Sequence, residues 1–323
     1  MNGQPAPPGL AKAASDWFTR APTGIERVPV DFRGNRIEAE VLNFLAARQS
    51  HYTESFGVQW AKYRAVQVDR LSGGKSSYNH LKMFVQDDLD ILRGKTVLEI
   101  GSGAGRFTDY LVDLAERVIT VDPSAIASNV ALGAQNLIAV RADLFDVPVK
   151  RERIDVVFCR GVTQHTVDPA RAIKRLFGYV KPGGTVLFDI YHLKWFTAFT
   201  AKYWLRPFTR RIPAGRFIPF AERWVPRLLR FKQKFVTPLL PRNNLGINIG
   251  NQLVPIADFT GADELGGWDR QVAWSILDTV DMYTPRYDRP MTWHAVMNAL
   301  GQVGAMDIRG DRSTFCFRAM AAK

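Results

Sequence analysis

The chain has 323 residues, of which 46% are hydrophobic, enough to form one large domain or a catalytic domain with a cap. Its two cysteines exclude a disulfide framework and a zinc cluster, so we expect a cytoplasmic protein without a metal site. The net charge is +12, yet no window reaches the roughly 18 consecutive apolar residues of a membrane span.

The N-terminal part is predicted to precede the catalytic core. Residues 1–50 are interpreted as a tail and leader, since residues 1–9 are rich in proline and glycine and lack the apolar segment of a signal peptide. Residues 51–93 are predicted to form a helical leader, with Thr53 or Ser55 as the cap. Four of its side chains recur at helical spacing: Phe56, Trp60, Tyr63 and Gln67.

A glycine-rich loop follows the first strongly apolar strand. Residues 97–100 run directly into Gly101, Gly103 and Gly105, and residues 106–108 are predicted to open a helix. Glycine allows a sharp turn and lets backbone N–H groups approach a nucleotide-like ligand. A dinucleotide site would place its third glycine at position 106, where this chain has arginine.

Two further strands end in acidic residues. The second strand, residues 117–121, leads into Asp122 and Pro123, and an acid there can accept hydrogen bonds from both ribose hydroxyls of NAD or S-adenosylmethionine. The third strand, residues 137–141, is followed by Asp143, which is placed to meet an adenine amino group.

The fourth and fifth strands continue the alternation with helices. Residues 154–159 run into a polar loop that contains His165, and Asp168 is predicted to cap the next helix. A turn at residues 181–184 then precedes the strand at residues 185–190. Such alternation predicts a doubly wound, mostly parallel sheet whose ligand lies at the carboxyl ends of the strands.

The motif set over residues 94–190 resembles class I S-adenosylmethionine-dependent methyltransferases, and more narrowly the bacterial small-molecule subgroup that includes the quinone-biosynthesis enzymes. The matching segments are Glu99–Arg106, Val121–Asp122, Ala142–Leu144, Gln164–Thr166 and Lys181–Gly184. The resemblance implies a seven-stranded Rossmann-like sheet and S-adenosyl-L-methionine as cofactor. A nucleotide-binding α/β domain of another kind is the alternative.

The same resemblance assigns cofactor-binding roles. Asp122 would bind the ribose, Asp143 and Leu144 the adenine, and Glu99 the amino end through water. Similar leaders fold over the cofactor in many small-molecule methyltransferases, so Gln59 would bind its methionine end, although the leader could simply pack on the sheet. The complete predicted set is Gln59, Glu99, Gly101, Ser102, Gly103, Gly105, Asp122, Pro123, Asp143, Leu144 and Arg160.

Methyl transfer from a sulfonium requires collinear alignment of nucleophile, carbon and sulfur, and needs a base only if the acceptor keeps its proton. No universal catalytic residue can therefore be transferred from the family. Our candidate is His165, because its loop follows the fourth strand; the alternative is a hydrogen bond that orders this loop. Weaker candidates on the same rim are Arg160, Gln164, Tyr191 and His192.

Residues 191–290 are predicted to be an inserted basic and aromatic cap. Between residues 194 and 242, twelve basic residues stand against one acid, which gives +11 and leaves +1 for the rest of the chain. Two stripes at helical spacing predict a basic amphipathic helix: Trp224, Leu228, Phe231 and Phe235, and beside them Arg223, Arg227, Arg230 and Lys234. Six prolines are expected to cut the segment into short pieces.

Three interpretations of this insert remain open. The aromatic side of the cap could pack on the catalytic domain while the arginines are solvated. Alternatively, the insert could contact an anionic membrane, or it could bind nucleic acid. Residues 278–288 are polar and are interpreted as a returning loop or a linker. Residues 291–323 are predicted to complete the core with a helix and a strand pair.

We therefore expect a cytoplasmic methyltransferase that acts at oxygen on a small-molecule or lipid-linked acceptor. Peripheral contact with the inner membrane face is an open alternative for its location. One alternative is an RNA methyltransferase, but residues 159–162 lack the Asn/Asp-Pro-Pro-aromatic tetrapeptide. The other is a noncatalytic cofactor-binding or membrane-associated protein. The oligomeric state stays open.

Overall fold

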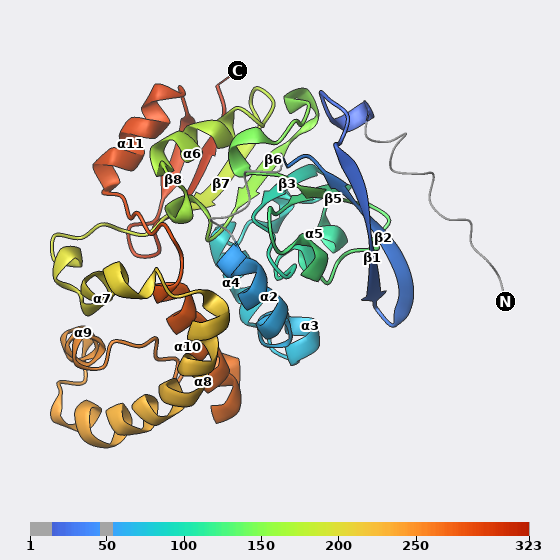
Figure 1. Ribbon diagram of the computed structural model, residues 1–323. Coiled ribbons are helices and arrows are strands. Elements are labelled where there is room, and N and C mark those ends of the chain that lie inside the picture. Colours follow the sequence, from blue (N-terminus) through green and yellow to red (C-terminus); the bar gives the residue numbers. More distant parts are fainter. Residues whose placement is uncertain (1–14, 46–53, 323) are drawn as a thin grey trace. The chain divides into compact units, whose positions relative to one another are not determined.

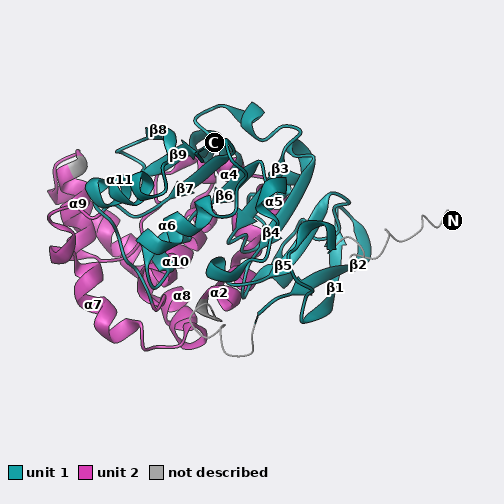
Figure 2. Cartoon of the chain, turned by 90° about the horizontal axis from the view of Figure 1, so that it is seen from above, with its two compact units in different colours: residues 1–51, 78–192, 287–323 teal, residues 52–77, 193–286 magenta. Residues whose placement is uncertain are grey.

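The computed structural model describes residues 15–45 and 54–322, and the predicted tail at residues 1–9 and the candidate cap Thr53 lie outside them. The described chain folds into two compact units (Figure 2). Unit 1 comprises residues 15–45, 78–192 and 287–322, and unit 2 comprises residues 54–77 and 193–286. No helix in these ranges has both the length and the apolar character that crossing a bilayer requires.

Unit 1 is built on one nine-stranded sheet in the order β1-β2-β5-β4-β3-β6-β7-β9-β8 (Figure 1). The strands are β1 (Gly24–Phe32), β2 (Asn35–Asn43), β3 (Thr96–Ile100), β4 (Arg117–Val121), β5 (Leu137–Arg141), β6 (Val156–Cys159), β7 (Thr185–Asp189), β8 (Met306–Gly310) and β9 (Cys316–Met320). Strands β3 to β7 are parallel, and β9 runs antiparallel between β7 and β8. The predicted doubly wound sheet is confirmed.

Helices cover both faces of this sheet because its apolar residues alternate between them. Leu98 and Ile119 pack with α6 (Pro169–Phe177) and α11 (Trp293–Gln302). Val97 and Val118 point to the other face and pack with α4 (Ser76–Phe84) and α5 (Thr108–Leu114). The predicted cap of α6 is confirmed, because the Asp168 carboxylate accepts a hydrogen bond from the Arg171 backbone N–H at 2.9 Å.

The sheet has two more strands than the seven predicted. The additional pair is the hairpin of β1 and β2, and β2 pairs in parallel with β5. The interpretation of residues 1–50 as tail and leader missed this hairpin. Pro29 lies in β1, which is the edge strand, and a proline is tolerated there because an edge strand leaves one row of N–H groups unpaired.

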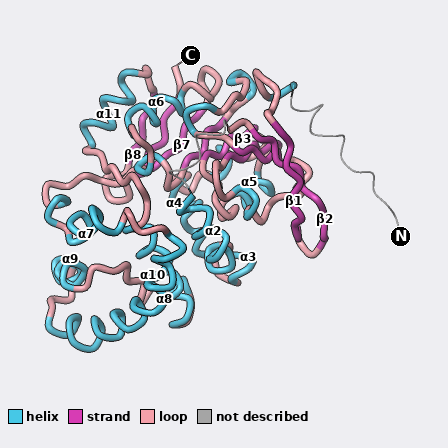
Figure 3. The backbone as a smooth tube through the Cα atoms, viewed as in Figure 1, coloured by secondary structure: helices cyan, strands magenta, loops and turns pink. Residues whose placement is uncertain are grey.

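Unit 2 contains helices and loops but no strand among its described residues (Figure 3). Its α-helices are α2 (Glu54–Gln67), α3 (Asp69–Ser72), α7 (Ala201–Thr209), α8 (Ala214–Phe231), α9 (Asn244–Leu253) and α10 (Trp268–Tyr283). Its core forms where α8, α10 and α2 meet, around Val225, Leu277 and Tyr63. The candidate cap Ser55 lies within α2 rather than before it.

Two sequence expectations for unit 2 are wrong. Pro219 and Pro226 lie inside α8, which continues through both for 18 residues, so prolines do not divide this part of the segment. Each proline removes one backbone hydrogen bond, but the buried face of the helix still packs on the core of unit 2. Residues 278–283, interpreted as a loop or linker, are the last part of α10.

Candidate functional site

The glycine loop leaves the carboxyl end of β3, next to β4 and β6 where the strand order reverses. Gly101 and Gly105 have φ values of +80° and +85°, a region that side chains rarely adopt. A Cβ atom on Gly101 would lie 2.1 Å from Val162 Cγ2, and one on Gly105 would lie 2.1 Å from Asn129 Oδ1. Both positions therefore require glycine.

Asp122 links this loop to the end of β4. Its Oδ2 accepts a hydrogen bond from the Gly103 backbone N–H at 3.0 Å. Its Oδ1 accepts from the backbone N–H groups of Ser124 at 2.9 Å and Ala125 at 2.6 Å. These bonds hold the buried carboxylate at the edge where ligands bind in open α/β sheets.

Glu99 lies beneath the loop in β3 and is buried. Its Oε2 accepts hydrogen bonds from the hydroxyls of Thr108 at 2.6 Å and Thr120 at 2.8 Å. Burial raises the pKa of Glu99 to about 7, although the two threonine hydroxyls lower it in part. The native state therefore binds a proton at Glu99 more tightly than the unfolded chain does.

We expect Glu99→Gln to become more stable relative to the wild type as the pH rises from about 4.5 through 7. The ionised wild-type carboxylate destabilises the native state above the raised pKa, by at most about 3 kcal/mol, whereas both side chains are neutral at low pH. Urea unfolding at pH 5 and pH 8 measures the difference. Exposed Glu116→Gln is the control, and an equal effect of Glu99→Gln at both pH values would contradict the expectation.

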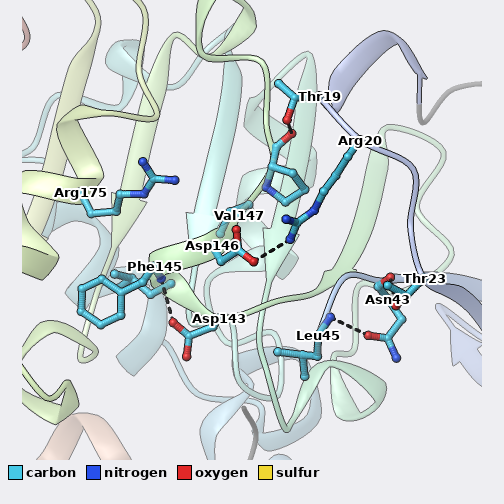
Figure 4. A network of polar contacts seen from close by, with 12 residues as sticks. Thr19, Arg20, Thr23, Asn43, Leu45, Asp143, Phe145, Asp146, Val147 and Arg175 are labelled. Carbon is cyan, nitrogen blue, oxygen red and sulfur yellow. Dashed lines mark hydrogen bonds and ion pairs between the residues drawn. The ribbon is translucent and has the colours of Figure 1, made fainter. Parts of the chain in front are cut away.

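Asp143 follows β5 and begins the short helix η3 (Leu144–Asp146). Its Oδ1 accepts a hydrogen bond from the Phe145 backbone N–H at 2.8 Å, so the carboxylate turns back over its own loop (Figure 4). The Tyr179 hydroxyl donates to the Leu144 carbonyl at 2.6 Å. Arg20, from before the hairpin, pairs with Asp146 at 2.6 Å, and this pair is also drawn in Figure 4.

The loop after β6 fixes His165. Its Nδ1 lies 3.0 Å from the backbone carbonyl oxygen of Tyr287. Because a carbonyl oxygen only accepts hydrogen bonds, Nδ1 carries the proton of the neutral ring, and Nε2 is the nitrogen that accepts one. The Tyr191 ring packs edge-on against the imidazole, with 5.6 Å between centroids. The alternative loop-ordering bond is thus present, and the role of His165 as a base stays a prediction.

Arg160 lies at the end of β6 and forms an ion pair with Asp189, at the end of β7, at 2.9 Å. The Asp189 carboxylate also accepts from the Gly161 backbone N–H at 2.6 Å. The Arg160 guanidinium lies 5.2 Å from the ring centroid of Phe84. Arg160 thus joins the ends of two parallel strands.

A family model described as a methyltransferase domain matches residues 77–220. The chain contains a methyltransferase domain. The chain is 33% identical over 173 residues to a ubiquinone biosynthesis O-methyltransferase of Nitrobacter winogradskyi, with 49% of this chain and 59% of that protein covered. It is 30% identical over 183 residues to one of Rhodopseudomonas palustris, with 53% and 66% covered. The chain thus spans less than two thirds of either relative.

Solved structures similar to part of this chain include an S-adenosylmethionine-dependent methyltransferase from Aquifex aeolicus. It is 18% identical, with 41% of this chain and 73% of that chain covered, and the TM-score is 0.34. A second, from Mesorhizobium loti, is 24% identical, with 31% and 48% covered and a TM-score of 0.29.

The residues of the methyltransferase domain fit a nucleoside cofactor. Ser102 lies in the glycine loop, and its buried hydroxyl has no hydrogen-bond partner among the described residues. Gly101 and Gly105 let the loop pack closely against Val162 and Asn129. Asp122 and Asp143 follow β4 and β5. A ligand hydroxyl at this edge would pair the Ser102 oxygen.

The predicted set is divided between the two units. Gln59 lies on α2 in unit 2, is buried, and donates from Nε2 to the Leu277 carbonyl at 3.2 Å. All other predicted residues lie in the methyltransferase domain at the ends of β3, β4, β5 and β6. Pro123 is held there by the Arg141 guanidinium, which donates to its carbonyl at 3.2 Å. Their roles toward a ligand remain predictions.

Sequence reasoning missed the residues that hold this site in place. Asn129 bonds the Thr108 hydroxyl at 2.9 Å and closes over Gly105, and Asp189 fixes Arg160 and Gly161. Asp189 could have been found, because it is an acid at the end of a predicted parallel strand, as Asp122 is. Asn129 carries no such signal, because its position depends on a loop with no regular pattern.

Proposed function

We propose that the chain is an S-adenosylmethionine-dependent methyltransferase that methylates oxygen on a small-molecule or lipid-linked acceptor. The observation that carries the proposal is the Asp122 carboxylate bonded to the Gly103 N–H at the reversal point of the sheet. This geometry occurs within the methyltransferase domain. The relatives named ubiquinone biosynthesis O-methyltransferases support oxygen as the acceptor atom.

The cofactor-binding roles follow from this edge of the sheet. S-adenosylmethionine supplies, when bound, a methyl group made electrophilic by a positively charged sulfur. Asp122 would accept hydrogen bonds from the ribose hydroxyls, and Asp143 from the adenine amino group beside Leu144. Glu99 would attract the amino end through water. Ser102, Pro123 and the three loop glycines would line the same crevice, and Arg160 is proposed as a further contact at its margin.

His165 is proposed as the base. A hydroxyl acceptor keeps its proton near neutral pH, so a proton must leave as the bond between oxygen and methyl carbon forms and the bond between carbon and sulfur breaks. Nε2 would take that proton, because Nδ1 is already committed to the Tyr287 carbonyl. The resulting imidazolium would keep its Nδ1–H bond, so the ring would not need to turn during the step.

The proposed location is the cytoplasm, with contact at the inner membrane face through residues 194–242. Both cysteines are free and buried, which fits a reducing compartment. A lipid-linked acceptor would require the enzyme to work at a membrane surface, and the basic segment would hold it there.

The test follows methyl-labelled S-adenosylmethionine into the lipid, small-molecule and RNA fractions of a cell extract. We expect the wild type to label the lipid or small-molecule fraction. His165→Ala should lower kcat at least a hundredfold, since a general base contributes about that much or more, with the affinity for S-adenosylmethionine unchanged. The exposed histidine of α11 gives the control His294→Ala, which should retain wild-type turnover.

Three results would count against parts of the proposal. Label that enters only RNA would replace the small-molecule acceptor with a nucleic-acid substrate. Tight cofactor binding without transfer to any fraction would indicate a noncatalytic protein. Normal turnover of His165→Ala would remove His165 as the base and leave it the role of ordering its loop.

A further inference from the structure

Unit 2 exposes an unusual set of aromatic side chains. Among the described residues, every exposed phenylalanine and tryptophan lies between residues 195 and 235. Trp195 is 87% exposed, and Phe208 is 70% exposed. Single exposed apolar side chains are normal on a protein surface, but a concentration of large ones marks an interaction surface.

The longest helix of unit 2, α8, organises part of this set. Its buried face is formed by small and aliphatic residues with one phenylalanine: Ala214, Phe217, Ile218, Ala221, Val225 and Leu229. The aromatic stripe lies off this buried face, because Trp224 is 42% and Phe231 is 49% exposed. Within unit 2, the core therefore packs on aliphatic and small side chains of α8 and not on this aromatic stripe.

The exposed side of α8 and of the following turn, η7 (Lys232–Val236), carries two adjacent stripes. At about 100° per residue, Phe220, Trp224 and Phe231 of α8 fall within about 40° of one another, and the Phe235 ring in η7 packs on the Phe231 ring. The basic stripe lies directly beside them, on the side away from the core. We call these eight residues the docking face: Phe220, Trp224, Phe231, Phe235, Arg223, Arg227, Arg230 and Lys234.

Contacts within the docking face hold it together. The rings of Phe220 and Trp224 lie 6.4 Å apart between centroids, and those of Phe231 and Phe235 lie 5.3 Å apart. The Arg227 guanidinium lies 5.7 Å from the Trp224 ring centroid. Cations stacked beside exposed rings keep their charge at the surface while the rings remain available to an apolar partner.

The charge of the segment selects an anionic partner. Glu222 is the only acid between residues 194 and 242. Its carboxylate forms an ion pair with Lys62 at 2.7 Å and accepts a hydrogen bond from the Tyr63 hydroxyl at 2.9 Å. No other carboxylate between residues 194 and 242 opposes the basic stripe. A surface with this charge and with exposed rings fits either nucleic acid or a membrane of anionic lipid.

The neighbouring helix α9 favours the membrane. It has no charged residue, and it exposes aliphatic side chains, with Leu245 at 61%, Ile247 at 60% and Leu253 at 63%. It packs on η7, because Gly250 approaches the Lys232 side chain. Aliphatic side chains do not stack on bases, but they do enter the boundary between headgroups and acyl chains.

We propose that the docking face of α8 and η7 binds the surface of an anionic lipid bilayer. The basic stripe contacts the headgroups, and the aromatic stripe lies at headgroup depth. This inference rests on the membrane contact proposed above and names the surface that makes it. It does not depend on methyl transfer, so it can fail while the proposed methyltransferase activity stands.

Flotation with vesicles of phosphatidylcholine, with and without 30 mol% phosphatidylglycerol (a chosen composition), tests the proposal. The wild type should float only with the anionic vesicles, and the bound fraction should fall as salt rises. Replacing the four basic residues with glutamine should weaken partitioning roughly tenfold or more. Replacing the four aromatic residues with serine should weaken it at low salt as well, because that loss is not electrostatic.

The matched control neutralises four exposed cations elsewhere, Arg36, Lys75, Lys95 and Arg312, and should float as the wild type does. The proposal is overturned if the wild type stays in solution with anionic vesicles, if it binds a single-stranded RNA instead, or if the control loses as much binding as the docking-face variants. Circular dichroism checks that each variant is folded. Cofactor affinity in solution should be unchanged in all of them, which separates a failure here from a failure of the proposed methyl transfer.

Discussion

Asp122→Ala is expected to weaken S-adenosylmethionine binding at least tenfold. The carboxylate would bind the ribose, and losing a charge-assisted pair of hydrogen bonds costs about that much or more. The substitution also releases the Gly103 N–H, so the glycine loop loses one of its hydrogen bonds to the end of β4, while the Gly101 N–H still donates to the Val121 carbonyl at 2.7 Å. Isothermal titration with S-adenosylmethionine and its demethylated product measures the effect.

Two companion variants make this result specific. Asp122→Asn keeps an acceptor oxygen but loses the charge, and we expect it to bind more tightly than the alanine variant. Asp113 is an exposed acid whose partner is the exposed Arg33, so Asp113→Ala should leave the affinity unchanged. Wild-type affinity in Asp122→Ala would remove the ribose assignment and with it the central part of the proposed site.

Gly105→Ala should destabilise the native state by about 3 kcal/mol and abolish measurable cofactor binding. The residue has a φ of +85°, which an alanine tolerates poorly. The new Cβ would also lie 2.1 Å from Asn129 Oδ1 and 2.9 Å from the Val130 backbone nitrogen. Since a backbone atom cannot move aside as a flexible side chain does, the loop itself must shift.

The control is Gly301→Ala in α11, where a Cβ meets no atom within 4 Å and the backbone φ is not positive. Alanine favours a helix over glycine, so this variant should be as stable as the wild type or more stable by up to about 1 kcal/mol. Denaturant unfolding of both variants provides the comparison. Equal stabilities for the two substitutions would show that the glycine loop is not under the steric constraint described above.

The sequence predicted the core of the methyltransferase domain closely. The second and third predicted strands coincide with β4 and β5, because each is a short apolar run between polar boundaries. Asp122 and Asp143 lie at their carboxyl ends as expected, because the carboxyl ends of parallel strands meet at one edge of a sheet. The N-cap at Asp168 was also predictable, since capping depends on neighbouring residues alone.

By itself, the sequence determined where the parallel strands lie along the chain and which glycines and acids follow them. Strand positions depend on the period of apolar residues, and the glycines on local backbone geometry. Only the tertiary structure decided which face of α8 is buried, since a helix with two apolar stripes can pack either one, and the choice depends on α10 and α2. Likewise, only the fold brought Asp189 to Arg160 and the Tyr287 carbonyl to His165, because contacts between residues so distant along the chain leave no local pattern.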